Sequence, residues 1–178
     1  MYRFYCPDTD FSKSSAIIRD THEIHHIKDV LRMKKGDCIQ IFNGLSQQAD
    51  AVIEAIHEAS IQVRLTHIKQ EYHTGPKLIL ACAPPKKGKF EVIIEKCTEL
   101  GVDEIIPLKT ARTEVVFKEE RIKSKMSRFE TVALNAAKQS KRTRVPRIGP
   151  MTPLQQVLEN LEPGSLRLFP SLHGHPKH

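Results

Sequence analysis

Charged side chains gather at both ends of a predicted helix–strand unit in the middle of the chain. Three lysines come before the helix: Lys86, Lys87 and Lys89. After it, one acid and two bases are expected to cluster where the helix ends and the strand exits: Glu99, Lys109 and Arg112. In an open α/β sheet, ligands bind at the edge where the strands exit. Cations at that edge suit an anionic ligand, although the same pattern is typical of an ordinary αβ unit with a solvated basic face.

The helix and strand that would position these groups are predicted from apolar spacing. Apolar residues three and four apart define one face of the helix: Phe90, Ile93, Ile94, Cys97 and Leu100. Gly101 follows where a helix favours a left-handed C-terminal cap. Ile105 and Ile106 form a short apolar run that predicts a buried strand closed by Pro107.

Positive charge is concentrated in the second part of the 178-residue chain, whose formal net charge is +7. Residues 1–75 hold nine Lys and Arg against ten Asp and Glu, whereas residues 76–178 hold nineteen against eleven. Between Arg121 and Arg147 there are nine bases and a single acid, Glu130. A field of one sign on one segment favours a polyanion partner such as nucleic acid, although basic surfaces also serve solubility.

The first part of the chain is predicted to be a small β-barrel. Short strands are expected at residues 2–5, 38–42, 51–56 and 61–65, with one helix over residues 21–33. Ile24, Ile27, Val30 and Leu31 are expected to share one face of that helix. Asn43-Gly44 is a strong hairpin signal between two of the strands.

The remaining elements predict an α/β unit with a parallel sheet. Residues 70–76 are polar and end in Gly75-Pro76, which indicates a linker between domains 1–72 and 76–178. Strands are predicted at residues 77–83, 115–117 and 166–169, besides the central one. Helices are predicted over residues 121–139, with one apolar and one basic side, and over residues 155–161.

Several protein classes do not fit the sequence. The four cysteines are scattered without a C-x-x-C pair, which favours free thiols over disulfides or a zinc site. His22, His25 and His26 lie close together but have no third ligand type nearby, so no metal site is expected. No apolar run approaches the roughly 20 residues of a membrane span. We expect a cytoplasmic protein without a membrane partner.

Motif order and spacing from about Tyr2 to Leu168 resemble the RsmE family of 16S rRNA uracil-N3 methyltransferases, in the SPOUT superfamily. The most specific part is residues 89–112 with the core Glu99-Leu100-Gly101-Val102. It is followed by Gln139-Ser140-Lys141-Arg142 and Val145-Pro146, and residues 26–37 add a weaker upstream match.

The resemblance implies an N-terminal PUA-like β-barrel followed by a SPOUT-type domain that methylates N3 of a uridine in 16S rRNA. It implies S-adenosylmethionine as methyl donor, the small ribosomal subunit as partner and a homodimer as assembly. Arg112 and Arg142 are expected to stabilise charge on the uracil, and Glu99 to orient an arginine. RNA contacts are expected from Arg32, Lys34, Lys35, Lys86, Lys87, Lys89, Gln139, Ser140, Lys141 and Arg144.

The sequence departs from the family pattern after residue 148. Gly149-Pro150 is followed by Met151-Thr152, and no Gly-Pro-Glu-Gly-Gly loop occurs in the chain. In the family this loop belongs to the trefoil knot that encloses S-adenosylmethionine, so we expect this chain to lack the knot and not to bind the cofactor with useful affinity. The alternative function is that of a non-catalytic, truncated relative that binds RNA.

Overall fold

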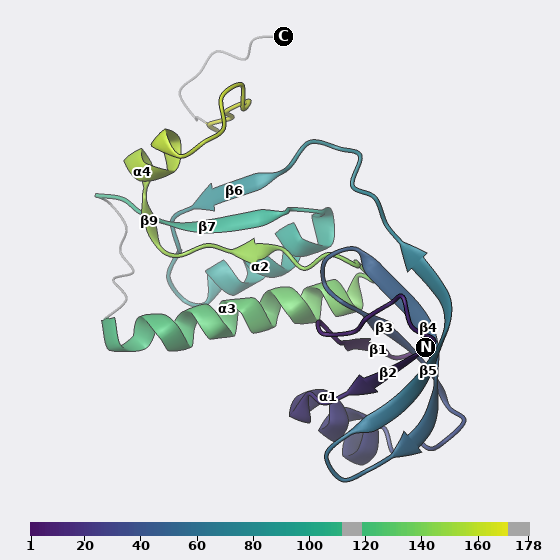
Figure 1. Cartoon of the computed structure of the whole chain (residues 1–178). Coiled ribbons are helices and arrows are strands. Elements are labelled where there is room, and N and C mark those ends of the chain that lie inside the picture. Colours follow the sequence, from purple (N-terminus) through teal and green to yellow (C-terminus); the bar gives the residue numbers. More distant parts are fainter. Residues whose placement is uncertain (112–118, 171–178) are drawn as a thin grey trace.

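Along the chain, the spacing of apolar residues changes from every second position, as in strands, to every three or four positions, as in helices. The structure accordingly has two separate sheets, and two long helices lie between strands of the second one. The computed structural model describes residues 1–111 and 119–170. A mixed sheet lies at the N-terminal side, and a parallel sheet covered by two helices follows it (Figure 1).

The N-terminal sheet is a five-stranded half-barrel. Its order is β1 (Arg3–Tyr5), β3 (Cys38–Phe42), β4 (Gln47–Ile56), β5 (Ile61–Gln70) and β2 (Ser15–Ile18). β1 and β3 are parallel, and the other pairs are antiparallel. In β5 the predicted alternation is confirmed, because Ile61, Val63 and Leu65 are buried while Gln62 and Arg64 are exposed. Inward-facing side chains of the strands thus build the first hydrophobic core.

The helix predicted over residues 21–33 is shorter and changes its winding. α1 (Thr21–His25) begins at the N-cap Asp20 and continues into a π-helical segment, η1 (His26–Val30). The wider π turn rotates the following side chains away from the face that 3.6-residue spacing predicts. Ile27 is fully buried, whereas Val30 is 58% exposed, so the prediction that Val30 lies on the apolar face is wrong.

The second half has the predicted parallel sheet. β6 (Ile79–Cys82), β7 (Glu104–Lys109) and β8 (Arg147–Ile148) lie side by side, and β9 (Thr152–Pro153) also pairs with β7. α2 (Lys89–Leu100) and α3 (Glu119–Gln139) pack on one face of this sheet (Figure 1). Phe90 and Phe129 meet edge to face at 5.0 Å between ring centroids, which joins the two helices. α4 (Leu154–Glu159) follows β9.

Two strand predictions in this half need correction. β7 runs through Pro107 to Lys109. On one side, β7 pairs with β8 at Glu104 and Ile105 and with β9 at Leu108 and Lys109. Pro107 lies in the gap between these two pairings, so its missing N–H interrupts neither of them. Residues 166–169 form no strand, and Leu166, Leu168 and Phe169 are more than 80% exposed. The strand predicted at residues 115–117 lies outside the described residues.

The two halves meet along a seam formed by the C-terminal end of α3 and the loop after it. Lys138 on α3 forms an ion pair with Glu23 on α1, and both side chains are largely buried. Val145 donates its backbone N–H to the Gly44 carbonyl over 2.8 Å. A Cβ atom on Gly44 would lie 2.7 Å from the Tyr5 ring, so the close approach of β1 and the β3–β4 turn requires glycine.

Within the described ranges, no helix is both long and apolar enough to cross a membrane.

Candidate functional site

Most of the predicted site residues of the second half divide between the two opposite edges of the parallel sheet. α2 and α3 run against the direction of the strands, so the end of α2 lies at the N-terminal edge of β7 (Figure 1). The predicted cluster of Glu99 with Lys109 is therefore wrong, because the whole of β7 separates them. Six residues of strand span roughly 17 Å.

At the C-terminal edge, a basic loop surrounds a cavity of about 170 Å³. The loop of residues 84–88 leads from β6 into α2, and Phe90 and Glu91 of α2 with Lys125 and Phe129 of α3 complete the lining. Lys87 and Gly88 both adopt left-handed conformations, with φ of 62° and 73°. Lys86 and Lys87 precede α2, as predicted, whereas Lys89 is its first residue, and all three lysines are exposed.

At the N-terminal edge, Arg142 holds the end of α2. Its Nη1 donates to the carbonyl oxygens of Thr98 at 2.6 Å and of Val102 at 3.0 Å. Thr98 lies in the last turn of α2, whose carbonyls lack partners within the helix, and Val102 directly follows the C-cap Gly101. Burial lowers the pKa of Arg142, and the neighbouring charge of Arg144 lowers it further. The negative charges of Asp103 and Glu71 act in the opposite direction and raise the pKa of Arg142.

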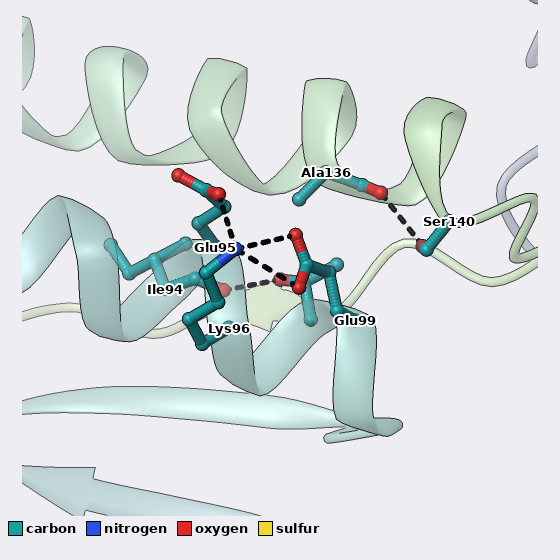
Figure 2. Close-up of polar contacts among 7 residues, drawn as sticks. Ile94, Glu95, Lys96, Glu99, Ala136 and Ser140 are labelled. Carbon is teal, nitrogen blue, oxygen red and sulfur yellow. Dashed lines mark hydrogen bonds and ion pairs between the residues drawn. The ribbon is translucent and has the colours of Figure 1, made fainter.

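Glu99 and Ser140 lie near the same edge (Figure 2), and Gln139 is the last residue of α3. Lys96 donates to both carboxylate oxygens of Glu99, at 3.1 and 3.2 Å, and to Glu95 at 2.8 Å. The Ser140 hydroxyl donates to the Ala136 carbonyl over 2.7 Å, which extends the end of α3. Gln139 is exposed.

A second cavity, of about 150 Å³, opens at the seam between the halves. It is lined by Glu71, Tyr72 and His73 after β5, and by Arg142, Thr143 and Arg144 after α3. The Thr143 hydroxyl, which is almost fully buried, donates to the Glu71 carboxylate. Sequence reasoning assigned residues 71–73 to a linker and missed them. The available signal was an unbroken run of hydrogen-bonding side chains, residues 70–74, immediately before Gly75-Pro76.

The other predicted residues lie elsewhere. Arg32, Lys34 and Lys35 are exposed on the loop after η1 of the half-barrel. Lys141 is exposed after α3 and has a left-handed φ of 59°. Arg112 falls outside the described residues. No group of three or more His, Cys, Asp or Glu side chains that could hold a metal occurs in the part of the chain described.

The class of protein follows from comparison with known families. The profile of the RNA methyltransferase domain matches residues 73–178, and that of the RNA methyltransferase PUA domain matches residues 18–66. The chain belongs to the RNA methyltransferase domain family. The coarser part of the predicted fold class is confirmed, namely a mixed half-barrel followed by a parallel α/β unit, whereas the absence of the trefoil knot stays a prediction.

Two relatives that the chain resembles along most of its length carry the same name. Ribosomal RNA small subunit methyltransferase E of Bacillus subtilis is 33% identical over 141 residues, which cover 79% of this chain and 55% of the relative. The Rickettsia conorii protein of the same name is 29% identical over 171 residues, which cover 96% and 67%. The predicted resemblance is confirmed. The chain spans about half to two thirds of the length of these relatives.

One solved structure shows how far the fold agrees. It is ribosomal RNA small subunit methyltransferase E from Neisseria gonorrhoeae bound to S-adenosyl methionine, with a TM-score of 0.79. The match covers 92% of this chain and 66% of that chain at 22% identity, so it shows the fold alone.

Neither cavity of the described residues fits S-adenosylmethionine. The cofactor carries a sulfonium cation, and like charges repel strongly where solvent is partly excluded. Cations outnumber acids in both linings. Lys86, Lys87 and Lys125 line the cavity at the C-terminal edge against one acid, Glu91. Arg142 and Arg144 line the seam cavity against one acid, Glu71. We therefore assign none of the described residues to the cofactor.

Proposed function

We propose that the chain serves the methylation of ribosomal RNA, with S-adenosylmethionine as donor and N3 of a uridine in 16S rRNA as acceptor. The carrying observation is that an RNA methyltransferase PUA domain and then an RNA methyltransferase domain match in this order along one chain. The names of its relatives, ribosomal RNA small subunit methyltransferase E, support the substrate. In this proposal the partner is the small ribosomal subunit, the assembly is a homodimer and the compartment is the cytoplasm.

The chemistry defines what side chains of this chain would do. N3 must lose its proton, and negative charge then develops on the uracil oxygens, where positioned cations stabilise it. Arg112 and Arg142 remain the proposed cations. Because the bonds of Arg142 to Thr98 and Val102 fix one end of its guanidinium, that group would meet the RNA preorganised. Glu99 remains proposed as an orienting acid, although its hydrogen bonds go to Lys96.

Methyl transfer can be tested directly. Small ribosomal subunits that lack the modification would be incubated with the protein and methyl-tritiated S-adenosylmethionine, and the RNA digested to nucleosides. We expect tritium in 3-methyluridine, and none with large subunits as substrate. Retained binding to small subunits without any transfer would contradict the proposed activity and favour the RNA-binding alternative.

We also propose the division into domains 1–72 and 76–178. β5 ends at Gln70 and β6 begins at Ile79, and residues 71–79 are all exposed. A protease should cut first between Gln70 and Pro76 and leave a β-barrel fragment. A first cut between Ala51 and Leu65 would contradict this division.

A further inference from the structure

The seam cavity joins two segments that are far apart in the sequence. Glu71, Tyr72 and His73 come from the connection between the halves, and Arg142, Thr143 and Arg144 from the loop after α3. Its volume of about 150 Å³ compares with about 30 Å³ for one water molecule in the liquid. The cavity can therefore admit a phosphate group together with a few waters.

The charges around the cavity leave one guanidinium without a protein partner. Arg142 uses Nη1 to hold the end of α2, and Arg144 makes no hydrogen bond or ion pair among the described residues. Arg144 nevertheless lies close enough to Arg142 to disfavour its charged form. Two like charges held together at a partly buried site are stabilised by an anion, and guanidinium groups bind phosphate oxygens in a bidentate manner.

Two carboxylates offset only part of this positive charge. Asp103 acts electrostatically on Arg142, whereas Glu71 acts on both Arg142 and Arg3 and also accepts the hydrogen bond of Thr143.

Arg3 adds a buried cation on the half-barrel side. It is 9% exposed, stacks 4.3 Å above the Phe42 ring and donates to Gln48 over 3.1 Å. Its Nε and Nη1 are buried and have no hydrogen-bond partner. An excess of positive charge and unsatisfied donors thus surrounds the Glu71 side of the seam.

We propose that the seam cavity binds one phosphate group of an RNA backbone, with Arg144 as its main ligand and Arg142 as a second, fixed cation. That the phosphate group belongs to RNA rests on the proposed function, whereas the binding of a phosphate group rests on the residues that line the cavity. A phosphate at this position contacts both halves at once. It therefore fixes the register of the RNA relative to the half-barrel and the parallel sheet, as phosphate contacts do in general.

The test uses the whole chain and three phosphate-bearing probes: inorganic phosphate, uridine 5′-monophosphate and a ten-nucleotide oligouridylate. Arginine side-chain N–H signals would be followed by NMR, with assignments from Arg144→Gln and Arg144→Lys. Arg144 is the position to vary because its loss removes no bond of the described fold, whereas loss of Arg142 would free the end of α2. Lys123→Gln, an exposed lysine near the opposite end of α3, is the matched control for charge.

We expect the oligouridylate to shift the Arg144 signal and Arg144→Gln to reduce its affinity roughly fivefold at 0.1 M salt. The slope of log K against log salt should fall by about 0.7, the value of one single-strand phosphate contact. Arg144→Lys should recover part of this loss, since it keeps the charge but not the bidentate geometry. The thermal midpoint should not change.

The outcomes separate the two proposals. If none of the probes shifts the Arg144 signal, or if Lys123→Gln lowers the slope as much as Arg144→Gln does, the phosphate site is overturned. A shift with the monophosphate but not with the oligouridylate supports the phosphate site and overturns RNA as its source. Failure of methyl transfer together with a shifted Arg144 signal refutes the proposed function and leaves the phosphate site standing.

Discussion

The ion pair between Lys138 and Glu23 should dominate the docking of the two halves. Their side chains are only 19% and 6% exposed. Glu23 also accepts the backbone N–H of Tyr5 over 3.2 Å. Replacing Lys138 with Met keeps an unbranched apolar stem but leaves the Glu23 carboxylate buried without its cation.

The loss in the free energy of unfolding depends on which of the two charges is left buried without its partner. Removing one partner of a buried ion pair costs about 3–5 kcal/mol, and we expect the lower value for Lys138→Met because the Tyr5 N–H remains. Glu23→Gln should cost about 2 kcal/mol, since Lys138 is partly exposed and can reach water. The double variant should cost less than the sum of the two, because it leaves neither charge unpaired.

Thermal and urea unfolding of the three variants would measure these values. A loss of about 3 kcal/mol corresponds to roughly 6–12 °C for a chain of this size. Lys96→Met is the matched control, because Lys96 is 56% exposed in its pairs with Glu95 and Glu99 and should contribute about 0–1 kcal/mol. If Lys138→Met costs no more than Lys96→Met, the pair is screened by water and the argument from burial is refuted.

Three further predictions concern binding, backbone and pH. Gly44→Ala should lower the free energy of unfolding in urea by about 2–3 kcal/mol, because φ is +77° and the added Cβ meets the Tyr5 ring. Gly36→Ala, with φ of +94° and no atom within 4 Å of the added Cβ, should cost only about 1 kcal/mol. Equal costs would contradict the contribution of the contact with Tyr5. Burial, with a smaller contribution from Glu23, raises the pKa of the Cys6 thiol to about 12, from 9.0. Between these values only the folded state keeps the proton, so stability should fall as pH rises from 9 to 12, and a Cys6→Ala variant that retains the fall would refute this. A variant with alanine at Lys141, Arg142 and Arg144 should bind RNA more weakly, and its slope of log K against log salt should fall by up to about 2. An unchanged slope would show that these three side chains do not contact RNA.

Local chemistry in the sequence determined the helices and the two longest strands of the second half, β6 and β7, but neither β8 nor β9. Gly101 ends α2 with φ of 107°, as its position after the last apolar residue predicted. The apolar spacing in α3 placed Phe129, Ala133, Ala136 and Ala137 in the core. Alternating strand and helix patterns were sufficient for a parallel sheet, because a helix between two strands returns the chain to the same edge.

Only the tertiary structure decided where the charged groups meet. The sequence places Glu99 and Lys109 ten residues apart, but α2 and β7 run in opposite directions and β7 separates them. Conversely, residues 71 and 143 come together at the seam, where Thr143 donates to Glu71. Contacts between such distant residues depend on the docking of the half-barrel against α3, and apolar periodicity within either segment carries no information about that docking.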